Sequence, residues 1–210
     1  IRKQDDAAWM AMLKGVVAQI IPAAQGMYAD QFSPSSLLAM ETWLRVWDDI
    51  ITYFPDAMTL IHVDAHPKQM FFPTDALPRF ALFDWQQPAK NLGANDVARL
   101  LVTGLSIEDR RAHEQELVAG YFAELCRRGV TGLTAERLWM QIKLANVFNF
   151  YINVIASLQT DTQILAAMAE AEGADWRVAM LGKVSAATDD WRVGDLLEAY
   201  AAEARAARAG

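Results

Sequence analysis

Five polar side chains that can act on a substrate or a metal are crowded into one short segment of the chain. The segment lies between two apolar runs, and its polar residues are His62, Asp64, His66, Lys68 and Gln69. A second carboxylate, Asp84, directly follows the next apolar run. The runs on either side of the turn-rich stretch 73–78 predict a β-hairpin, and a short hairpin brings its two ends together. We therefore expect Asp64, Gln69 and Asp84 to converge.

Two carboxylates and an amide in this arrangement suit phosphoryl transfer. One carboxylate must orient the attacking hydroxyl and accept its proton, while oxygen ligands hold Mg²⁺ against the nucleotide phosphates. Mg²⁺ prefers oxygen and takes few protein ligands. Asp64 is the candidate for the first role, and Asp84 with the carbonyl oxygen of Gln69 is the candidate metal site.

The elements around this loop must position it. Short β-prone runs are expected at 59–62, 70–72 and 80–83, of which the last two form the hairpin. Most of the remaining chain has apolar residues three or four positions apart, which is typical of amphipathic helices. The expected helices cover about 9–20, 37–54, 95–103, 106–128, 134–158, 161–172, 175–186 and 189–207. The sequence thus predicts a mostly α-helical (α+β) fold and a single domain over residues 1–210.

Boundary signals place several helix ends. Pro22 should interrupt or kink the first helix. Ser35 or Ser36 can cap the helix that Pro55 then closes. Thr134 caps a long helix that is apolar on most sides and is therefore expected to be central.

The loop resembles the catalytic loop H-G-D-x-H-x-x-N of the aminoglycoside phosphotransferase and choline/ecdysteroid-kinase-like family. His62, Asp64 and His66 match its two histidines and its catalytic aspartate, and Gln69 falls where the family has its metal-binding asparagine. Phe-Asp-Trp at 83–85 resembles the family's I-D-W, in which the aspartate is the main metal ligand. The resemblance implies a kinase-like C-terminal lobe with catalytic Asp64 and His66 and metal ligands Asp84 and Gln69.

The stretch Asn-Asp-Val-Ala-Arg-Leu-Leu at 95–101 resembles the family's D-L-A-x-L-L helix start. The family's aspartate braces the catalytic loop through backbone N–H groups. Asp96 and the packed His62 are therefore the candidates for supporting the loop. Lys68 is the candidate for binding the nucleotide, with a solvated charge as the alternative.

Three features depart from the family pattern. Val63 replaces the usual glycine, and Gln69 replaces asparagine. In addition, nothing before residue 55 resembles the Gly-rich turn and strand lysine of an N-terminal ATP-binding lobe. The resemblance implies ATP and Mg²⁺ as cofactors, a small-molecule hydroxyl as substrate and a separate N-terminal lobe that packs on this chain. Without that lobe, we expect the chain to turn over little or no substrate.

Two other functions stay open. His62, Asp64 and His66 alternate, so on a strand they would share one face and suit Zn²⁺, as in a metallohydrolase. Pro67 and the lack of a further histidine cluster argue against this. The other alternative is a catalytically degenerate kinase-like module that binds a partner or ligand, motivated by Gln69 and the missing lobe.

Composition narrows the function classes. The net charge of −7 argues against a nucleic-acid-binding surface. The single cysteine, Cys126, excludes an internal disulfide and is expected to be buried on an apolar helix face. No signal peptide or membrane span is visible, so we expect a cytoplasmic protein without a membrane partner. The aromatic residues Trp139, Phe148, Phe150 and Tyr151 are expected in the core, with pocket lining as the alternative.

Overall fold

The computed structural model describes residues 2–3, 7–51, 53, 56–76, 78–173 and 175–210. Helices dominate, and the prediction of a mostly α-helical α+β fold is confirmed. The α-helices are α1 (Ala7–Met27), α2 (Pro34–Arg45), α3 (Trp47–Ile50), α4 (Ala94–Gly104), α5 (Ile107–Arg127), α6 (Ala135–Leu144), α7 (Asn146–Gln159), α8 (Thr162–Glu172), α9 (Lys183–Asp190) and α10 (Val193–Ala209). Two short 3₁₀ helices, η1 (Ala29–Gln31) and η2 (Pro67–Gln69), and a π-helical segment, η3 (Val178–Gly182), complete the helical part.

In the described part of the chain, five short strands form two small sheets. The predicted hairpin is present as β3 (Met70–Phe71) and β4 (Ala81–Leu82), which pair antiparallel with Met70 opposite Leu82. The predicted strand before the loop is β2 (Thr59–Ile61), but its partner was not expected. It pairs antiparallel with β5 (Ala89–Asn91), which also pairs parallel with β1 (Arg2–Lys3). The loop of residues 62–69 therefore leaves one sheet at β2 and enters the other at β3.

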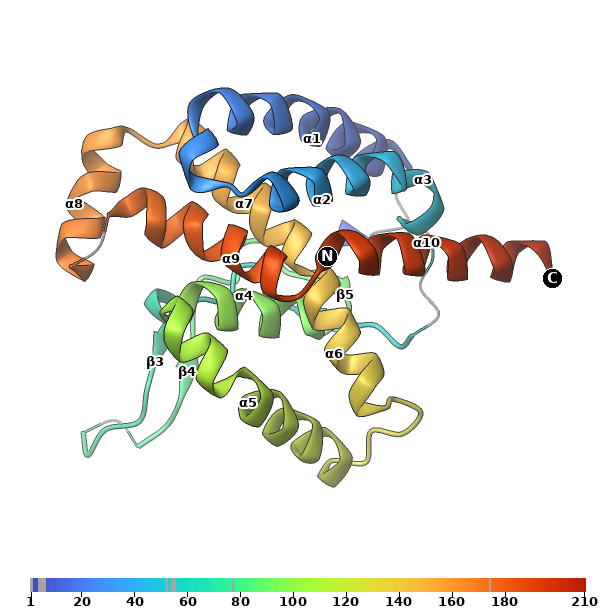
Figure 1. Ribbon diagram of the computed structural model, residues 1–210. Coiled ribbons are helices and arrows are strands. Elements are labelled where there is room, and N and C mark those ends of the chain that lie inside the picture. The colour runs from blue at the N-terminus through green and yellow to red at the C-terminus, as the bar shows by residue number, and fades with distance from the viewer. Residues whose placement is uncertain (1, 4–6, 52, 54–55, 77, 174) are drawn as a thin grey trace.

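Helix α7 lies at the centre of the helical part, as the sequence predicts for this segment. It contacts α1, α4, α6, α9 and η3, and Val147, Phe150 and Val154 on it are almost fully buried. Figure 1 shows α1 and α2 on one side of α7, and the β3–β4 hairpin projecting from the opposite side of the molecule.

Three buried asparagines on α7 connect it to its neighbours. Asn146 donates to the carbonyl oxygen of Val184 at 3.1 Å, and Asn149 donates to that of Ala98 at 3.3 Å. Asn153 donates to the carbonyl oxygen of Met180 at 2.6 Å. Because a buried amide without a partner is costly, these bonds fix how α4, η3 and α9 sit on α7.

Helices α2 and α10 pack along each other, and both contribute residues to the hydrophobic core. Trp43 is 1% exposed and lies against Trp47, with ring centroids 5.3 Å apart, and against Phe148, with centroids 5.8 Å apart. Such large buried aromatic rings contribute strongly to the stability of a core.

Several predicted helix boundaries are wrong. The sequence predicts that Pro22 interrupts or kinks the first helix; Pro22 does not interrupt it, and α1 continues to Met27. Ile20, Ile21 and Ala24 are buried, and their packing outweighs the lost backbone hydrogen bond. The cap of α2 is Ser33, whose Oγ accepts from the backbone N–H of Ser36 at 3.0 Å. Pro34 follows at the first helical position, where proline is favoured. The predicted closing residue Pro55 lies outside the described residues.

Breaks of one or two residues divide three stretches that the apolar pattern predicts as continuous or bounded elsewhere. Val46 separates α2 from α3, and Ala145 separates α6 from α7. Trp191 and Arg192, the latter with a φ of +52°, separate α9 from α10. The apolar spacing runs on across each break, so periodicity alone cannot locate it.

The prediction for Cys126 is also wrong, because its side chain is exposed. It lies in the last turn of α5, where the helix extends beyond the core. None of the helices in the described part of the chain is long and apolar enough to cross a membrane.

The packing of α2 predicts a large difference between two positions on that helix. Trp43→Ala should lower the free energy of unfolding by about 3–5 kcal/mol, because it leaves a cavity between Trp47 and Phe148. Leu38→Ala, at a site that is 60% exposed, should change it by less than about 0.5 kcal/mol. Urea denaturation of both variants measures this, and similar losses would contradict the described core.

Candidate active site

The loop and the hairpin bring the three predicted metal and catalytic residues together. The Nε2 amide nitrogen of Gln69 donates to Oδ2 of Asp64 at 3.3 Å and to Oδ2 of Asp84 at 3.1 Å. Gln69 is buried at the end of η2, and Asp84 stands exposed just after β4. The backbone N–H of Phe83 donates to the carbonyl oxygen of Gln69 at 3.0 Å, which holds the return strand beside the loop.

Asp96 lies beneath the loop at the start of α4 and accepts two backbone hydrogen bonds. They come from the N–H groups of His62 at 2.7 Å and Val63 at 2.9 Å. Burial raises the pKa of Asp96 above its ordinary value, although the two backbone bonds oppose the rise. The carboxylate thereby fixes the backbone of the loop immediately before Asp64.

Two residues of the site have positive φ angles. Val63 has a φ of +80° and Asp84 a φ of +67°. A β-branched residue in this region is strained, whereas glycine adopts it without penalty. The positive φ explains why the resembled loop pattern has glycine at this position, and Val63 adopts it only with strain. The strain is balanced by the hydrogen bond from Val63 to Asp96.

His62 connects the loop to the strand that carries Asp84. Its ring is 1% exposed and its Nε2 lies 2.8 Å from the carbonyl oxygen of Phe83. A carbonyl oxygen only accepts, so Nε2 carries the proton and donates. The ring also meets Trp85 edge to face, with centroids 4.8 Å apart. His62 therefore packs and hydrogen-bonds as a structural residue.

The contact that sequence reasoning missed is an ion pair between Arg99 and Asp64. Nε and Nη2 of Arg99 lie 3.0 and 2.9 Å from Oδ1 of Asp64, and Nη1 donates to Oδ1 of Asn153 at 2.6 Å. Arg99 is 7% exposed. It takes one oxygen of the Asp64 carboxylate and leaves Oδ2 facing Gln69 and, at 3.6 Å, Nε2 of His66.

This environment sets the charge of Asp64. Burial alone would raise the pKa of Asp64, but hydrogen bonding with His66 and the charge of Arg99 outweigh it. The pKa of Asp64 therefore lies below its ordinary value. At neutral pH the group is an ionised carboxylate, which can hold a hydroxyl group in place and accept its proton.

The residues present fit a hard divalent cation. Two carboxylate oxygens converge on one polar atom, and like charges so close together favour a cation between them. The carbonyl oxygen Oε1 of Gln69 is buried and has no hydrogen-bond partner. Because amide nitrogen and oxygen can exchange places by rotation, this oxygen can turn toward the carboxylates. Asp64, Asp84 and Gln69 would then offer an all-oxygen ligand set.

The zinc alternative gains no support. Across the described residues, no group of three or more His, Cys, Asp or Glu side chains could hold a metal ion. His62, which that alternative requires, is committed to the carbonyl oxygen of Phe83. The alternation of His62, Asp64 and His66 is therefore not a strand face of ligands, because the loop is irregular beyond His62.

Two cavities open on either side of the Arg99 guanidinium. The first, here the loop cavity, has a volume of ≈ 230 Å³ and contains Asp64, Gln69 and Asp84. Phe148 and Tyr151 of α7 line it, whereas Phe150 is buried in the core, so the predicted aromatic cluster divides between the two roles. The second, here the lysine cavity, has a volume of ≈ 330 Å³ and is lined on the loop side by His66 and Lys68.

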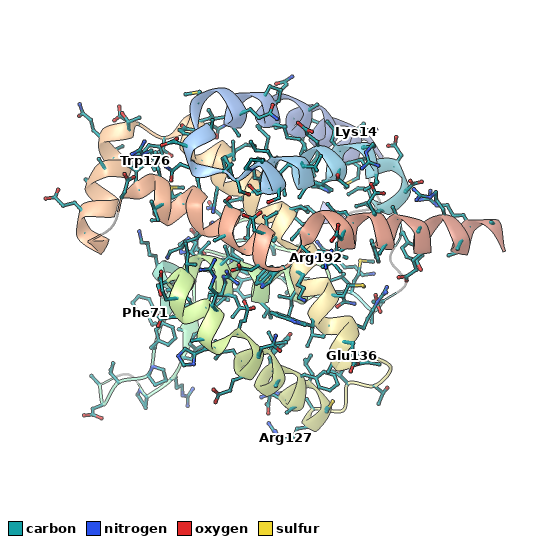
Figure 2. The ribbon with its side chains drawn as sticks, viewed as in Figure 1. Lys14, Phe71, Arg127, Glu136, Trp176 and Arg192 are labelled. Carbon is teal, nitrogen blue, oxygen red and sulfur yellow. The ribbon has the colours of Figure 1, made fainter. Side chains whose placement is uncertain are left out.

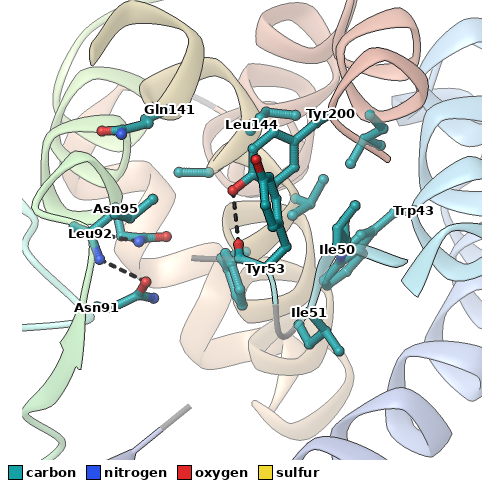
Figure 3. A pocket seen from close by; sticks show the side chains of 14 residues that line it. Trp43, Ile50, Ile51, Tyr53, Asn91, Leu92, Asn95, Gln141, Leu144 and Tyr200 are labelled. Carbon is teal, nitrogen blue, oxygen red and sulfur yellow. Dashed lines mark hydrogen bonds between the residues drawn. The ribbon is translucent and has the colours of Figure 1, made fainter. Parts of the chain in front are cut away.

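A third cavity lies between α3, α6 and α10 and lacks the groups for this chemistry. Figure 3 shows Tyr53 and Tyr200 side by side in it, where the hydroxyl of Tyr200 donates to the carbonyl oxygen of Tyr53 at 2.9 Å. The described residues that line it include no acidic or basic side chain. It therefore offers an apolar space and no catalytic group.

Comparison with known protein families places part of the chain in a described family. A family model with the description "Uncharacterized oxidoreductase dhs-27" matches residues 48–190. The matched range includes the loop, the hairpin, α4 and the helices through α9. No curated protein and no solved structure matches the chain.

The contact between α4 and the loop predicts an unusual effect of a small substitution. A Cβ atom on Gly104 would lie 2.9 Å from Cγ of Pro67, so Gly104→Ala should push η2 away and lower the free energy of unfolding by about 1–3 kcal/mol. Gly120→Ala, within α5 and with nothing within 4 Å, should raise it by about 0.5–1 kcal/mol. Thermal or urea unfolding of both variants measures the difference, and equal effects would show that η2 does not pack on Gly104.

The ion pair predicts a change in the titration of Asp64. Arg99→Met should raise the pKa of Asp64, measured by carboxyl ¹³C NMR, because the compensating charge is removed. Arg111→Met, which breaks an exposed pair with Asp190 on α9, should leave it unchanged.

The same variant has a stability effect with a defined pH dependence. The side chain of Asp64 is 38% exposed. We therefore expect Arg99→Met to lower the free energy of unfolding by about 2 kcal/mol, between the values for exposed and buried ion pairs. Because the folded-state pKa is lowered, the pair stabilises the protein above the ordinary aspartate pKa of about 4. The stabilisation is lost as the pH falls through the folded-state pKa of Asp64. The difference in free energy of unfolding between wild type and Arg99→Met should therefore become smaller in acid. A difference that stays constant or grows below about pH 4 would contradict the ion pair between Arg99 and Asp64.

Proposed function

The chain belongs to the family described as uncharacterized oxidoreductase dhs-27, which is related to choline- and ecdysteroid-kinase-like proteins, and from that premise we propose that it carries the catalytic residues of a phosphotransferase. In this proposal ATP and Mg²⁺ are used to phosphorylate a hydroxyl group of a small molecule. The observation that carries the proposal is the convergence of Asp64 and Asp84 on the side chain of Gln69.

Each residue then has a separate role. Asp84 and the carbonyl oxygen of Gln69 would hold Mg²⁺, which when bound would neutralise charge on the nucleotide phosphates. Asp64 orients the acceptor hydroxyl and takes up its proton. In the balanced reaction, a bond forms between the acceptor oxygen and the γ-phosphorus, the bond from that phosphorus to the bridging oxygen breaks, and ADP leaves. His66 borders the lysine cavity, 3.6 Å from Oδ2 of Asp64, and is a candidate for a contact with the transferred phosphate.

The depressed pKa of Asp64 is compatible with this role. A strongly ionised carboxylate is a weak base, so it contributes mainly by holding the hydroxyl in line and removes the proton late. Its position must be fixed for this to work, and positioning is a large part of such catalysis. Asp96, through the backbone of residues 62 and 63, and Arg99, through Oδ1, supply that fixation.

The word oxidoreductase in the family description finds no support in the Rossmann-type dinucleotide-binding motif. That motif is a glycine-rich strand-to-helix turn with the pattern G-x-G-x-x-G. The chain contains no two glycines separated by a single residue. No observation on the described residues favours a redox reaction over phosphoryl transfer.

One observation favours a second candidate, the catalytically degenerate binding module. In this structure the amide nitrogen of Gln69, rather than its oxygen, faces both carboxylates. An amide that stays in this orientation would take the place of the cation. Metal binding therefore separates the two candidates.

The proposed metal site predicts that one substitution in the full-length protein removes stabilisation by Mg²⁺ with ATP. Mg²⁺ with ATP should raise the melting temperature, and Asp84→Asn should abolish the Mg²⁺-dependent part of the shift, because a charged ligand is lost at nearly constant shape. Asp75→Asn, in the exposed turn of the hairpin, is the matched control and should keep the shift.

Turnover tests the roles further. Asp64→Asn and Asp84→Asn should each lower Mg²⁺-dependent formation of ADP from ATP by about 10²-fold or more. Asp84→Asn should leave the unfolding midpoint unchanged, whereas Asp64→Asn also removes the charge that pairs with buried Arg99 and should lower the midpoint. Wild-type rates in either variant would overturn the phosphotransferase assignment. Absence of any Mg²⁺-dependent shift in the wild-type protein would favour the binding module.

A further inference from the structure

The lysine cavity lies between the catalytic loop and the late helices of the chain. Its loop side consists of His66, Pro67 and Lys68, and its other walls come from α4, α7, α8 and the segment around η3. Its volume of ≈ 330 Å³ is in the range of small-molecule sites. Trp176 lines it at the side of the molecule that carries α8, as Figure 2 shows.

Positive charge is concentrated on this cavity. Lys68 lines it from η2 and Lys183 from the start of α9. Arg99 lines it from α4, but the charge of Arg99 is paired with Asp64. None of the described residues that line it is acidic. The chain as a whole carries a net charge of −7, so this concentration runs against its overall balance. A cavity lined by one sign of charge attracts and orients ligands of the opposite sign.

The remaining lining is apolar. Leu165 of α8, Trp176 and Met180 of η3 form a wall opposite the loop. Trp176 is half-buried and held by Tyr28, with ring centroids 5.9 Å apart and the planes nearly perpendicular. A fixed aromatic ring of this kind provides a flat surface for a ligand. The cavity thus combines an apolar wall with a cationic one.

The cavity is connected to Asp64 by a continuous set of hydrogen bonds. Arg99 borders both cavities, pairs with Oδ1 of Asp64 and donates to Asn153, which in turn donates to the carbonyl oxygen of Met180 at 2.6 Å. Met180 belongs to the π-helical segment, an irregularity that often occurs at functional sites. The wall of the lysine cavity is therefore positioned by the same groups that position Asp64.

We propose that the lysine cavity binds the acceptor, and that this acceptor is an anion: a hydroxyl compound with a carboxylate or phosphate group on an apolar body. The anionic group faces Lys68 and Lys183, the body lies on Trp176, and the hydroxyl reaches Asp64 next to His66. This inference rests on the proposed phosphotransferase function and adds the class of substrate.

A cationic acceptor is disfavoured by the same geometry. An amine in this cavity would lie among like charges, which costs binding energy and excludes the ligand by repulsion. The charges of Lys68 and Lys183 thus act as determinants of specificity. Removing them should abolish the preference for anions without affecting the metal site at Asp84.

The test is equilibrium binding to the full-length protein without nucleotide. Three probes share one phenol ring and one hydroxyl and differ only in charge: 4-hydroxyphenylacetate, its neutral amide, and tyramine. Glycerol 3-phosphate against glycerol forms a second arm, which distinguishes recognition of a phosphate from that of a carboxylate. We expect the anion of at least one arm to bind at least about tenfold more tightly than its neutral partner, and tyramine to bind weakest.

The charge variants complete the test. The double variant Lys68→Gln with Lys183→Gln should lose the preference, whereas Lys14→Gln with Lys90→Gln, which removes the same charge outside the cavity, should keep it. Unchanged melting temperatures show that both variants fold. Equal or tighter binding of the neutral or cationic probes, no binding of either anion at millimolar concentration, or a preference that survives the double variant would overturn the proposal.

This outcome is separable from that of the phosphotransferase proposal. Binding without nucleotide does not require Mg²⁺, and the Asp84→Asn variant should keep the preference for anions. Absence of the preference for anions in the wild-type protein, together with an intact Mg²⁺–ATP shift, would overturn only the acceptor class. A preserved preference without any Mg²⁺–ATP shift would overturn the phosphotransferase and leave an anion-binding cavity.

Discussion

The buried guanidinium of Arg99 is the group on which the arrangement of the site depends. A charge that is removed from water needs a partner of opposite sign and good hydrogen bonds, or it destabilises the fold. Asp64 meets this need with one oxygen and Asn153 with its amide oxygen. The loop, α4 and α7 are therefore held in one relative position by a requirement of charge burial. Asp64 gains a fixed orientation and a fixed charge from the same contact.

The rest of the fold supplies what this contact needs. The asparagines of α7 bond to backbone carbonyl oxygens of α4, η3 and α9, so the helix that carries Asn153 cannot rotate without breaking buried hydrogen bonds. Asp96 fixes the loop from below, and the backbone bond between residues 69 and 83 fixes it from the side. The strained φ of Val63 persists because these constraints act together.

Much of the local structure could be predicted from the sequence, because its signals are local. Turn residues between two apolar runs predict the hairpin, and with it the meeting of Asp64, Gln69 and Asp84. Thr134 and Ser106 begin helices where capping residues are expected. In contrast, β5 has neither alternation nor β-prone residues, and it becomes a strand only because β2 offers it a partner. Helix breaks at Val46 and Ala145 leave the apolar spacing intact and so leave no signal.

Two features that the sequence does not predict, one in the site and one at the end of α5, depend on contacts between distant parts of the chain. In the sequence, Arg99 occupies a position typical of an ordinary polar residue on a helix. Only the packing of α4 against the loop makes it the partner of Asp64. The exposure of Cys126 likewise depends on how far α5 extends past its neighbours. A periodic pattern indicates on which face of a helix a residue lies. It does not indicate which element packs on that face and so supplies the residue's partner.

The close approach of Gly104 to Pro67 has a consequence for how such sequences diverge. Any side chain at 104 must displace the proline ring while that ring is present. The two positions are therefore not independent in evolution. In related chains we expect a residue larger than glycine at the position of 104 only where the residue at the position of 67 is no longer proline. The two positions should therefore covary.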